Sequence, residues 1–181
     1  HATASSATRG TTRVLNRIET LGVIERLQRR VGGTTHGSAL TVWQLGAAGD
    51  RFRRARRGEP KRRRYEEPGR TFMSHMLAVA DTAVALIEQA NAGHFELLEL
   101  DLEPTCWRTF VSGSAAPITL KPDLLVVTAD PETETHSFVE VDLGTEHLPA
   151  VLRKCRTYQR YQTTGAEQHD RGLFPAVVWI A

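Results

Sequence analysis

The sequence has few of the features that mark secreted, membrane or zinc-binding proteins. Its two cysteines, Cys106 and Cys155, lie far apart without a CxxC pair, so a zinc site is not expected and a reducing cytoplasm is the default location. No apolar run approaches the roughly 20 residues of a membrane span, and no secretory signal is visible. The seven histidines lack the spacing of metal ligands. We therefore expect a cytoplasmic protein without a membrane partner.

Charge is the strongest compositional signal, because the two parts of the chain carry opposite excesses. Residues 1–70 hold 16 of the 23 Lys and Arg but 6 of the 21 Asp and Glu, a net charge of +10. Residues 71–181 hold the other 7 basic and 15 acidic residues, a net charge of −8. A strongly basic front part favours contact with nucleic acid, although a solvated tail would carry the same charges.

The front part has the pattern of a helix followed by two strands. Residues 11–21 place apolar side chains on one helical face, and Gly22 follows where a helix C-cap belongs. Residues 23–29 and 40–45 read as strands on either side of a Gly-rich turn. This order resembles the back half of a winged helix-turn-helix, and only about ten residues precede the helix. We therefore expect that the front helices of such a domain are missing.

In that resemblance, residues 11–21 form the recognition helix and the Gly-rich loop forms the wing. Their polar side chains suit contacts with phosphates and base edges. Double-stranded DNA is thus the expected partner, and the alternative, a winged helix used for protein contacts, is disfavoured by the density of arginine. The predicted DNA contacts are Arg9, Thr11, Thr12, Arg13, Asn16 and Arg17 from the helix and Arg29, Arg30 and His36 from the wing.

The pattern predicts an α+β fold in three segments: a partial winged helix in residues 1–50, a basic linker in 51–70 and a second domain in 71–181. The first part of the linker is able to extend a helix. In the second domain we expect a helix over 72–91, strands over 95–103, 118–127 and 136–142, a helix over about 148–161, and a last strand that ends at Ile180. We expect this domain to continue beyond the chain's end.

Three carboxylates are the candidate functional group of the second domain. Glu140 and Asp142 share one face of a predicted strand, and a polar loop joins that strand to the one that carries Asp123. If the strands pair, Asp123 comes close to Glu140. Such carboxylates bind Mg²⁺ or Mn²⁺, typically to act on a phosphodiester. The alternative is a hairpin with solvated acidic positions.

Lys-Pro-Asp at 121–123 and Glu-Val-Asp at 140–142 resemble the PD-(D/E)xK nuclease-like fold. The resemblance implies an α/β core in which Asp123, Glu140 and Asp142 bind the metal and act in catalysis. Asp142 stands where an active nuclease carries lysine, and Lys154 on the next helix is the candidate replacement. We therefore expect weak or absent nuclease activity.

A winged helix followed by such a core, with a His-containing helix at 75–81, resembles the replication-relaxation family of actinobacterial plasmids and mobile elements. The resemblance implies a DNA-binding accessory protein in replication, relaxation or transfer, with a relaxase or replication protein as a further partner; a homodimer is compatible with it. Two alternatives stay open: a Mg²⁺-dependent endonuclease or nickase, and a winged-helix transcription regulator. By residue type, His75 is expected to be a surface or capping residue and Tyr158 a half-buried helix residue.

Overall fold

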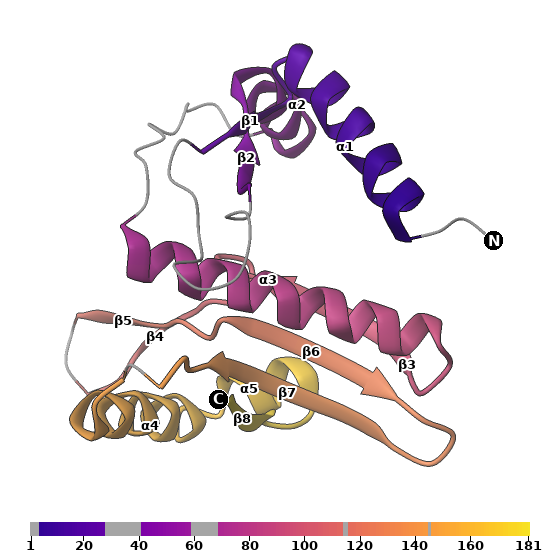
Figure 1. Ribbon diagram of the computed structural model, residues 1–181. Coiled ribbons are helices and arrows are strands. Elements are labelled where there is room, and N and C mark those ends of the chain that lie inside the picture. Colours follow the sequence, from indigo (N-terminus) through magenta and orange to yellow (C-terminus); the bar gives the residue numbers. More distant parts are fainter. Residues whose placement is uncertain (1–3, 28–40, 59–68, 114–115, 145) are drawn as a thin grey trace. The chain divides into compact units, whose positions relative to one another are not determined.

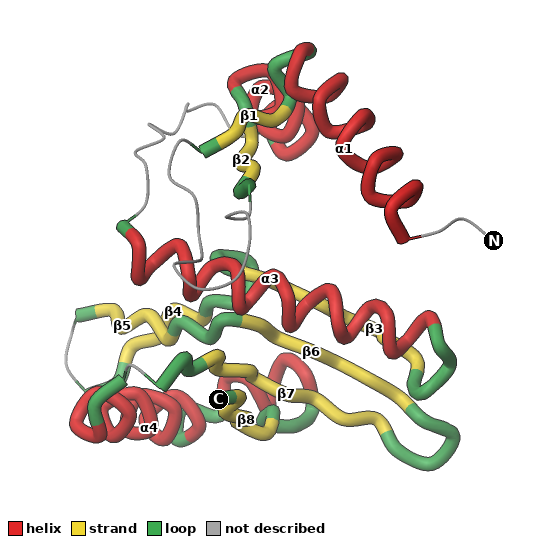
Figure 2. The backbone as a smooth tube through the Cα atoms, in the orientation of Figure 1, coloured by secondary structure: helices red, strands yellow, loops and turns green. Residues whose placement is uncertain are grey.

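The computed structural model describes residues 4–27, 41–58, 69–113, 116–144 and 146–181 (Figures 1 and 2). The fold is mixed α+β, as predicted. The chain divides into two compact units, His1–Gly69 and Arg70–Ala181, which are called unit 1 and unit 2 below.

The described residues of unit 1 form two helices and a two-stranded antiparallel sheet. Its elements are α1 (Ala4–Thr20), β1 (Ile24–Arg26), β2 (Trp43–Leu45) and α2 (Ala47–Arg57). Ile24 pairs with Leu45 and Arg26 with Trp43. The predicted helix over 11–21 begins earlier, at Ala4, and residues 51–57 of the expected linker continue α2.

Two glycines allow α2 to begin against the turn between α1 and β1. The amide of Gly46 donates to the carbonyl of Val23 (2.8 Å), and the amide of Ala48 donates to the carbonyl of Gly22 (3.0 Å). A Cβ atom at Gly46 would lie 2.4 Å from the Gly22 carbonyl oxygen, and one at Gly49 would lie 2.2 Å from that of Val23. The close approach therefore requires glycine at both positions.

The apolar face predicted for α1 is only partly covered within unit 1. Leu15 and Ile18 are half-buried, whereas Val14 and Leu21 are more than half exposed. The amide of Val23 donates to the carbonyl of Ile18 at the end of the helix (3.1 Å). Between Arg9 and Arg17, α1 thus presents mostly exposed side chains.

Unit 2 is built on a four-stranded sheet in the order β3-β6-β7-β8. Its elements are α3 (Arg70–Asn91), β3 (Glu96–Leu102), β4 (Arg108–Val111), β5 (Pro117–Leu120), β6 (Leu124–Ala129), β7 (Glu134–Val141), α4 (Leu148–Gln162), α5 (Ala166–Arg171) and β8 (Ala176–Ile180). β6 pairs antiparallel with β3 and β7, and β8 pairs parallel with β7. β4 and β5 form a separate antiparallel hairpin.

The alternation of side chains in β6 and β7 supplies a core on each face of the sheet. Val79 and Ala83 of α3 pack on one face, against Leu124, Val126, Val139 and Val141. Tyr158 and Tyr161 of α4 belong to the cluster on the other face, with Leu125 and Phe138. Figure 1 shows α3 lying along the sheet. Strands that are buried on both faces read as continuous apolar runs, as residues 124–127 do.

The single strand predicted over 118–127 is wrong, because the chain leaves the strand at 121–123. Residues 117–120 pair with β4, and residues 124–129 join the main sheet. Pro122 lies in the break, and proline has no N–H to donate to a strand ladder. The break places Asp123 immediately before the first residue of β6.

The described residues include one helix, Thr71–Asn91, that is long and apolar enough to cross a membrane, judged by length and composition only. From the sequence we expected no such segment. Its exposed apolar side chains are Phe72, Met76, Val84 and Ile87. Val79 and Ala83 of the same helix pack against residues of the sheet, so part of the helix is covered within unit 2.

Candidate functional site

The candidate site of unit 2 is centred on Asp123, a residue that is 5% exposed. Its amide donates to the carbonyl of Val139 (3.1 Å). Its Oδ2 accepts a hydrogen bond from the amide of Val141 (2.8 Å), and its Oδ1 lies 3.0 Å from Nε2 of His75 on α3. The carboxylate is therefore fixed at both oxygens, between the end of β7 and the first half of α3.

Glu140 of β7 is fully buried and turns toward α4. Its Oε1 accepts a hydrogen bond from the hydroxyl of Tyr158 (2.5 Å), and its Oε2 lies 2.5 Å from Nζ of Lys154. Lys154 also lies 3.7 Å from a carboxylate oxygen of Glu146. The lysine proposed as a replacement for the missing nuclease lysine thus contacts one of the predicted carboxylates.

Burial and neighbouring charges act in opposite directions on the pKa of each member of this pair. Burial raises the pKa of Glu140 to about 7, although Lys154 and Tyr158 act in the opposite direction. Burial alone would lower the pKa of Lys154, but the hydrogen bond and charge of Glu140, together with the charges of Asp123 and Glu146, raise it more, so the pKa of the amine is raised. The pKa of the Tyr158 hydroxyl is raised by burial and by Glu140, so the tyrosine is a hydrogen-bond donor and not a phenolate.

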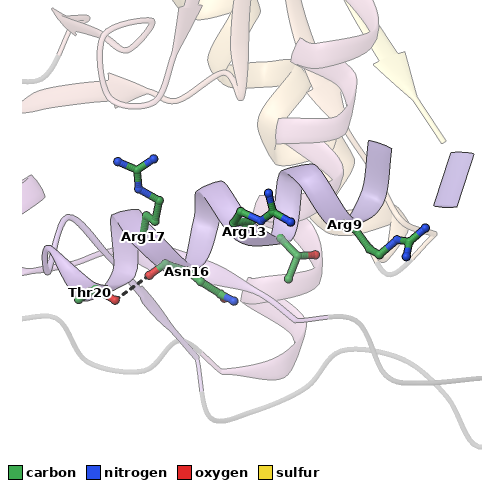
Figure 3. A pocket seen from close by; sticks show the side chains of 6 residues that line it. Arg9, Arg13, Asn16, Arg17 and Thr20 are labelled. Atoms are coloured by element: carbon green, nitrogen blue, oxygen red, sulfur yellow. Dashed lines mark hydrogen bonds between the residues drawn. The ribbon is translucent and has the colours of Figure 1, made fainter. Parts of the chain in front are cut away.

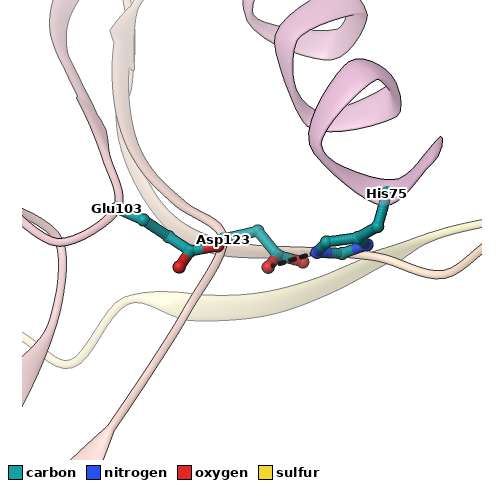
Figure 4. A group of neighbouring side chains, drawn as sticks. All are labelled: His75, Glu103 and Asp123. Atoms are coloured by element: carbon teal, nitrogen blue, oxygen red, sulfur yellow. Dashed lines mark hydrogen bonds and ion pairs between the residues drawn. The ribbon is translucent and has the colours of Figure 1, made fainter. Parts of the chain in front are cut away.

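A third acidic side chain, Glu103, approaches Asp123 from the end of β3. Burial raises the pKa of Glu103 most, and repulsion from Asp123 raises it further. One potential ligand atom from each of His75, Glu103 and Asp123 lies within 4.8 Å of the other two. Figure 4 shows the carboxylate of Asp123 between Glu103 and the ring of His75. These three side chains can hold a metal ion.

Asp123 belongs both to this group and to the carboxylate site predicted from the sequence. Glu140 has its oxygens on Tyr158 and Lys154, and within the described ranges no second group of three His, Cys, Asp or Glu side chains has this proximity. Asp142 accepts hydrogen bonds from the amides of Gly144 (2.9 Å) and Glu146 (3.4 Å) in the turn after β7. The metal roles of Glu140 and Asp142 stay predictions.

A cavity of about 390 Å³ opens beside these side chains. His75, Asp142, Glu146 and Lys154 contribute to its wall. The cavity gives a route from solvent to the imidazole and to the amine, so a small ligand can reach both. His75 and Glu103 are the members of the site that we did not predict from the sequence.

In unit 1, side chains of α1 line an open hollow of about 540 Å³ (Figure 3). Five of the predicted DNA contacts take part in it, namely Arg9, Thr12, Arg13, Asn16 and Arg17. The sixth predicted helix contact, Thr11, is exposed. The Asn16 amide oxygen also accepts a hydrogen bond from Arg26 of β1. The predicted wing contacts Arg29, Arg30 and His36 lie outside the described residues.

Comparison with known proteins identifies the family of the chain. The family model described as replication-relaxation matches residues 1–177, nearly the whole chain. No curated protein and no solved structure matches the chain.

Proposed function

The chain belongs to the replication-relaxation family, and we propose that it is a DNA-binding accessory protein in the replication, relaxation or transfer of a plasmid or mobile element. The observation that carries this proposal is the row of exposed arginines on α1. Arg9, Arg13 and Arg17 recur every four residues, so they share one face of the helix. They line the same hollow.

A helix with this face suits the major groove of duplex DNA. With a rise of 1.5 Å per residue, the three arginines extend over about 12 Å of helix. The major groove is about 12 Å wide and admits a helix, and arginine makes the commonest specific contacts with guanine as well as contacts with phosphates. The net charge of +10 in residues 1–70 adds attraction for any duplex.

The test is a gel shift of full-length protein on duplex DNA over a range of salt concentrations. Binding should weaken steeply as the salt concentration rises. The double variant Arg13→Ala, Arg17→Ala should make the negative slope of log K against log salt shallower, by about 0.9 for each phosphate that the protein no longer neutralises. If the two arginines contact bases, each substitution should cost about 1–3 kcal/mol and relax sequence preference.

Arg56→Ala with Arg57→Ala is the matched control, because it removes the same charge from exposed positions of α2. We expect the double variant in α2 to bind DNA more tightly than the double variant Arg13→Ala, Arg17→Ala in α1. Equally weakened binding in both double variants would remove α1 from the interface, and salt-independent binding would contradict the whole proposal.

A metal-dependent endonuclease or nickase is the second candidate, favoured by the contact between Lys154 and Glu140 close to Asp123. The contact holds the positive charge of Lys154 near the carboxylates. Lys154 could thereby substitute for the nuclease lysine, whose position is occupied by Asp142. The helix, three strands, helix and strand implied by the nuclease-like resemblance have counterparts in α3, β3, β6, β7, α4 and β8, with the β4–β5 hairpin inserted. A divalent ion at Asp123 would polarise a phosphodiester oxygen.

A plasmid-nicking assay with Mg²⁺ or Mn²⁺ separates the two candidates. For an accessory protein we expect little nicking, because Asp142 stands where an active nuclease carries lysine. One such preorganised group typically contributes a factor of about 10²–10³ to the rate. Robust nicking that both Asp123→Ala and Lys154→Ala abolish would establish the enzyme and overturn the accessory role of unit 2.

A further inference from the structure

We propose that His75, Glu103 and Asp123 form a site for a divalent transition ion of the Mn²⁺ class, which accepts nitrogen as well as oxygen ligands, in preference to Mg²⁺. The three side chains belong to unit 2. The inference goes beyond the DNA binding proposed for unit 1, and it is tested by metal binding alone.

The separation of the two central ligand atoms fits a shared ion. Two neighbouring ligands at about 2.1 Å from an octahedral ion lie about 3.0 Å apart. The distance between Nε2 of His75 and Oδ1 of Asp123 is 3.0 Å. The carboxylate of Glu103 completes a group with every pair of ligand atoms within 4.8 Å. An ion can therefore replace the His75–Asp123 hydrogen bond with little rearrangement.

The central carboxylate is held in place before any ion binds. Asp123 is almost fully buried, and its Oδ2 is held by the amide of Val141 (2.8 Å), so Oδ1 is the oxygen that faces His75. Hydrogen bonds of this kind orient a metal-binding carboxylate and reduce the entropy cost of binding. His75 is 29% exposed and Glu103 is exposed, which leaves a side open for the ion to enter.

The charge of the group also favours a cation. Asp123 and Glu103 carry charges of the same sign and lie close together in this group, so they repel each other. Within the described part of the chain, neither carboxylate forms an ion pair with a lysine or arginine; the partner of Asp123 is His75. A dication between them would neutralise two carboxylates that the described residues leave without such a partner.

The imidazole decides the class of ion. Mg²⁺ prefers oxygen ligands and gives up its waters reluctantly, whereas Mn²⁺ and its heavier neighbours accept an imidazole nitrogen together with carboxylates. A site with three carboxylates would favour Mg²⁺, so His75 is the residue that determines specificity.

The experiment titrates the full chain, freed of metal with EDTA and then dialysed, with Mn²⁺ alone, and follows free Mn²⁺ by electron paramagnetic resonance. We expect one ion per chain and little displacement by a tenfold excess of Mg²⁺. His75→Gln should weaken Mn²⁺ binding at least about tenfold, as removal of metal-supporting groups does, and should remove the preference over Mg²⁺. Glu103→Gln, at an exposed position, should also weaken binding.

His94→Gln is the control, because it removes an exposed histidine just after α3. It should bind Mn²⁺ like the wild type, and circular dichroism should show that each variant is folded. No saturable Mn²⁺ binding, equal affinity for Mg²⁺, or equally weakened binding in His75→Gln and His94→Gln would each overturn the proposal. A failure to bind DNA would leave it untouched.

Discussion

At the residue scale, Glu140 makes the stability of unit 2 depend on pH. The pKa of its carboxyl is about 7 in the folded chain, against an ordinary value of 4.5, chiefly because of burial. The folded state therefore holds a proton that the unfolded state has already released between these pH values. The stabilisation is fully present below about pH 4.5 and is lost as pH rises through about 7.

We expect Glu140→Gln to remove this pH dependence. Relative to the variant, wild type should lose up to about 3 kcal/mol of unfolding free energy between pH 4.5 and 8, at about 1.4 kcal/mol per pKa unit. Urea unfolding in EDTA measures the difference without metal. Glu132→Gln, at an exposed loop position, is the control and should follow the wild type. Parallel curves for wild type and Glu140→Gln would contradict a raised pKa.

The sequence indicated some members of the site and not others for a physical reason. Asp123 and Glu140 stand out because acidic residues oppose strand propensity, and Lys154 follows from the wetter side of an amphipathic helix. The pairing of His75 with Asp123 depends on where α3 lies along β6. Periodicity shows which face of α3 is apolar, but it does not position the helix along the strand.

At the element scale, two helical glycines should respond in opposite ways to the same substitution. Gly10 lies in α1 with no atom within 4 Å of an added Cβ, whereas a Cβ at Gly49 of α2 would lie 2.2 Å from the Val23 carbonyl oxygen. Gly10→Ala should stabilise its helix by about 1 kcal/mol through helix propensity. Gly49→Ala should destabilise unit 1, and hydrogen exchange of the unit 1 amides measures both.

The same propensity gain applies to both substitutions, so their difference isolates the backbone contact at Gly49. If Gly49→Ala protects the amides of α2 as Gly10→Ala protects those of α1, then the close approach of α2 to the turn is wrong.

Elements with a strong apolar period were predicted within a few residues, as α3, β3, β7, α4 and β8 show. The short helix α5 has no such period and was not predicted. It is held by tertiary contacts: Glu167, 2% exposed, accepts hydrogen bonds from Tyr161 and Arg108 (2.9 Å), and Arg171 binds Glu99 of β3 (2.7 Å). These partners lie in other elements, so a local sequence window does not contain the cause of the helix.

At the scale of the whole molecule, DNA binding and metal binding should separate by unit. Arg13→Ala with Arg17→Ala in the full chain should weaken DNA binding and leave Mn²⁺ affinity unchanged, because the arginines and the ligands belong to different units. His75→Gln should weaken Mn²⁺ binding and leave DNA binding unchanged when DNA binding is measured in metal-free buffer. Gel shifts and Mn²⁺ titrations on both variants test this, and a decrease of both properties in either one would show that the units are coupled.

The opposite charges of the two parts of the chain have a consequence for its orientation near DNA. In the field of a duplex, the +10 of residues 1–70 is drawn toward the polyanion and the −8 of residues 71–181 is pushed away. Near a duplex, the two parts of the chain would therefore experience opposite forces. A divalent ion held at the acidic end would reduce that charge from −8 to −6. Such an ion would weaken the repulsion between residues 71–181 and the phosphates, most strongly at low salt.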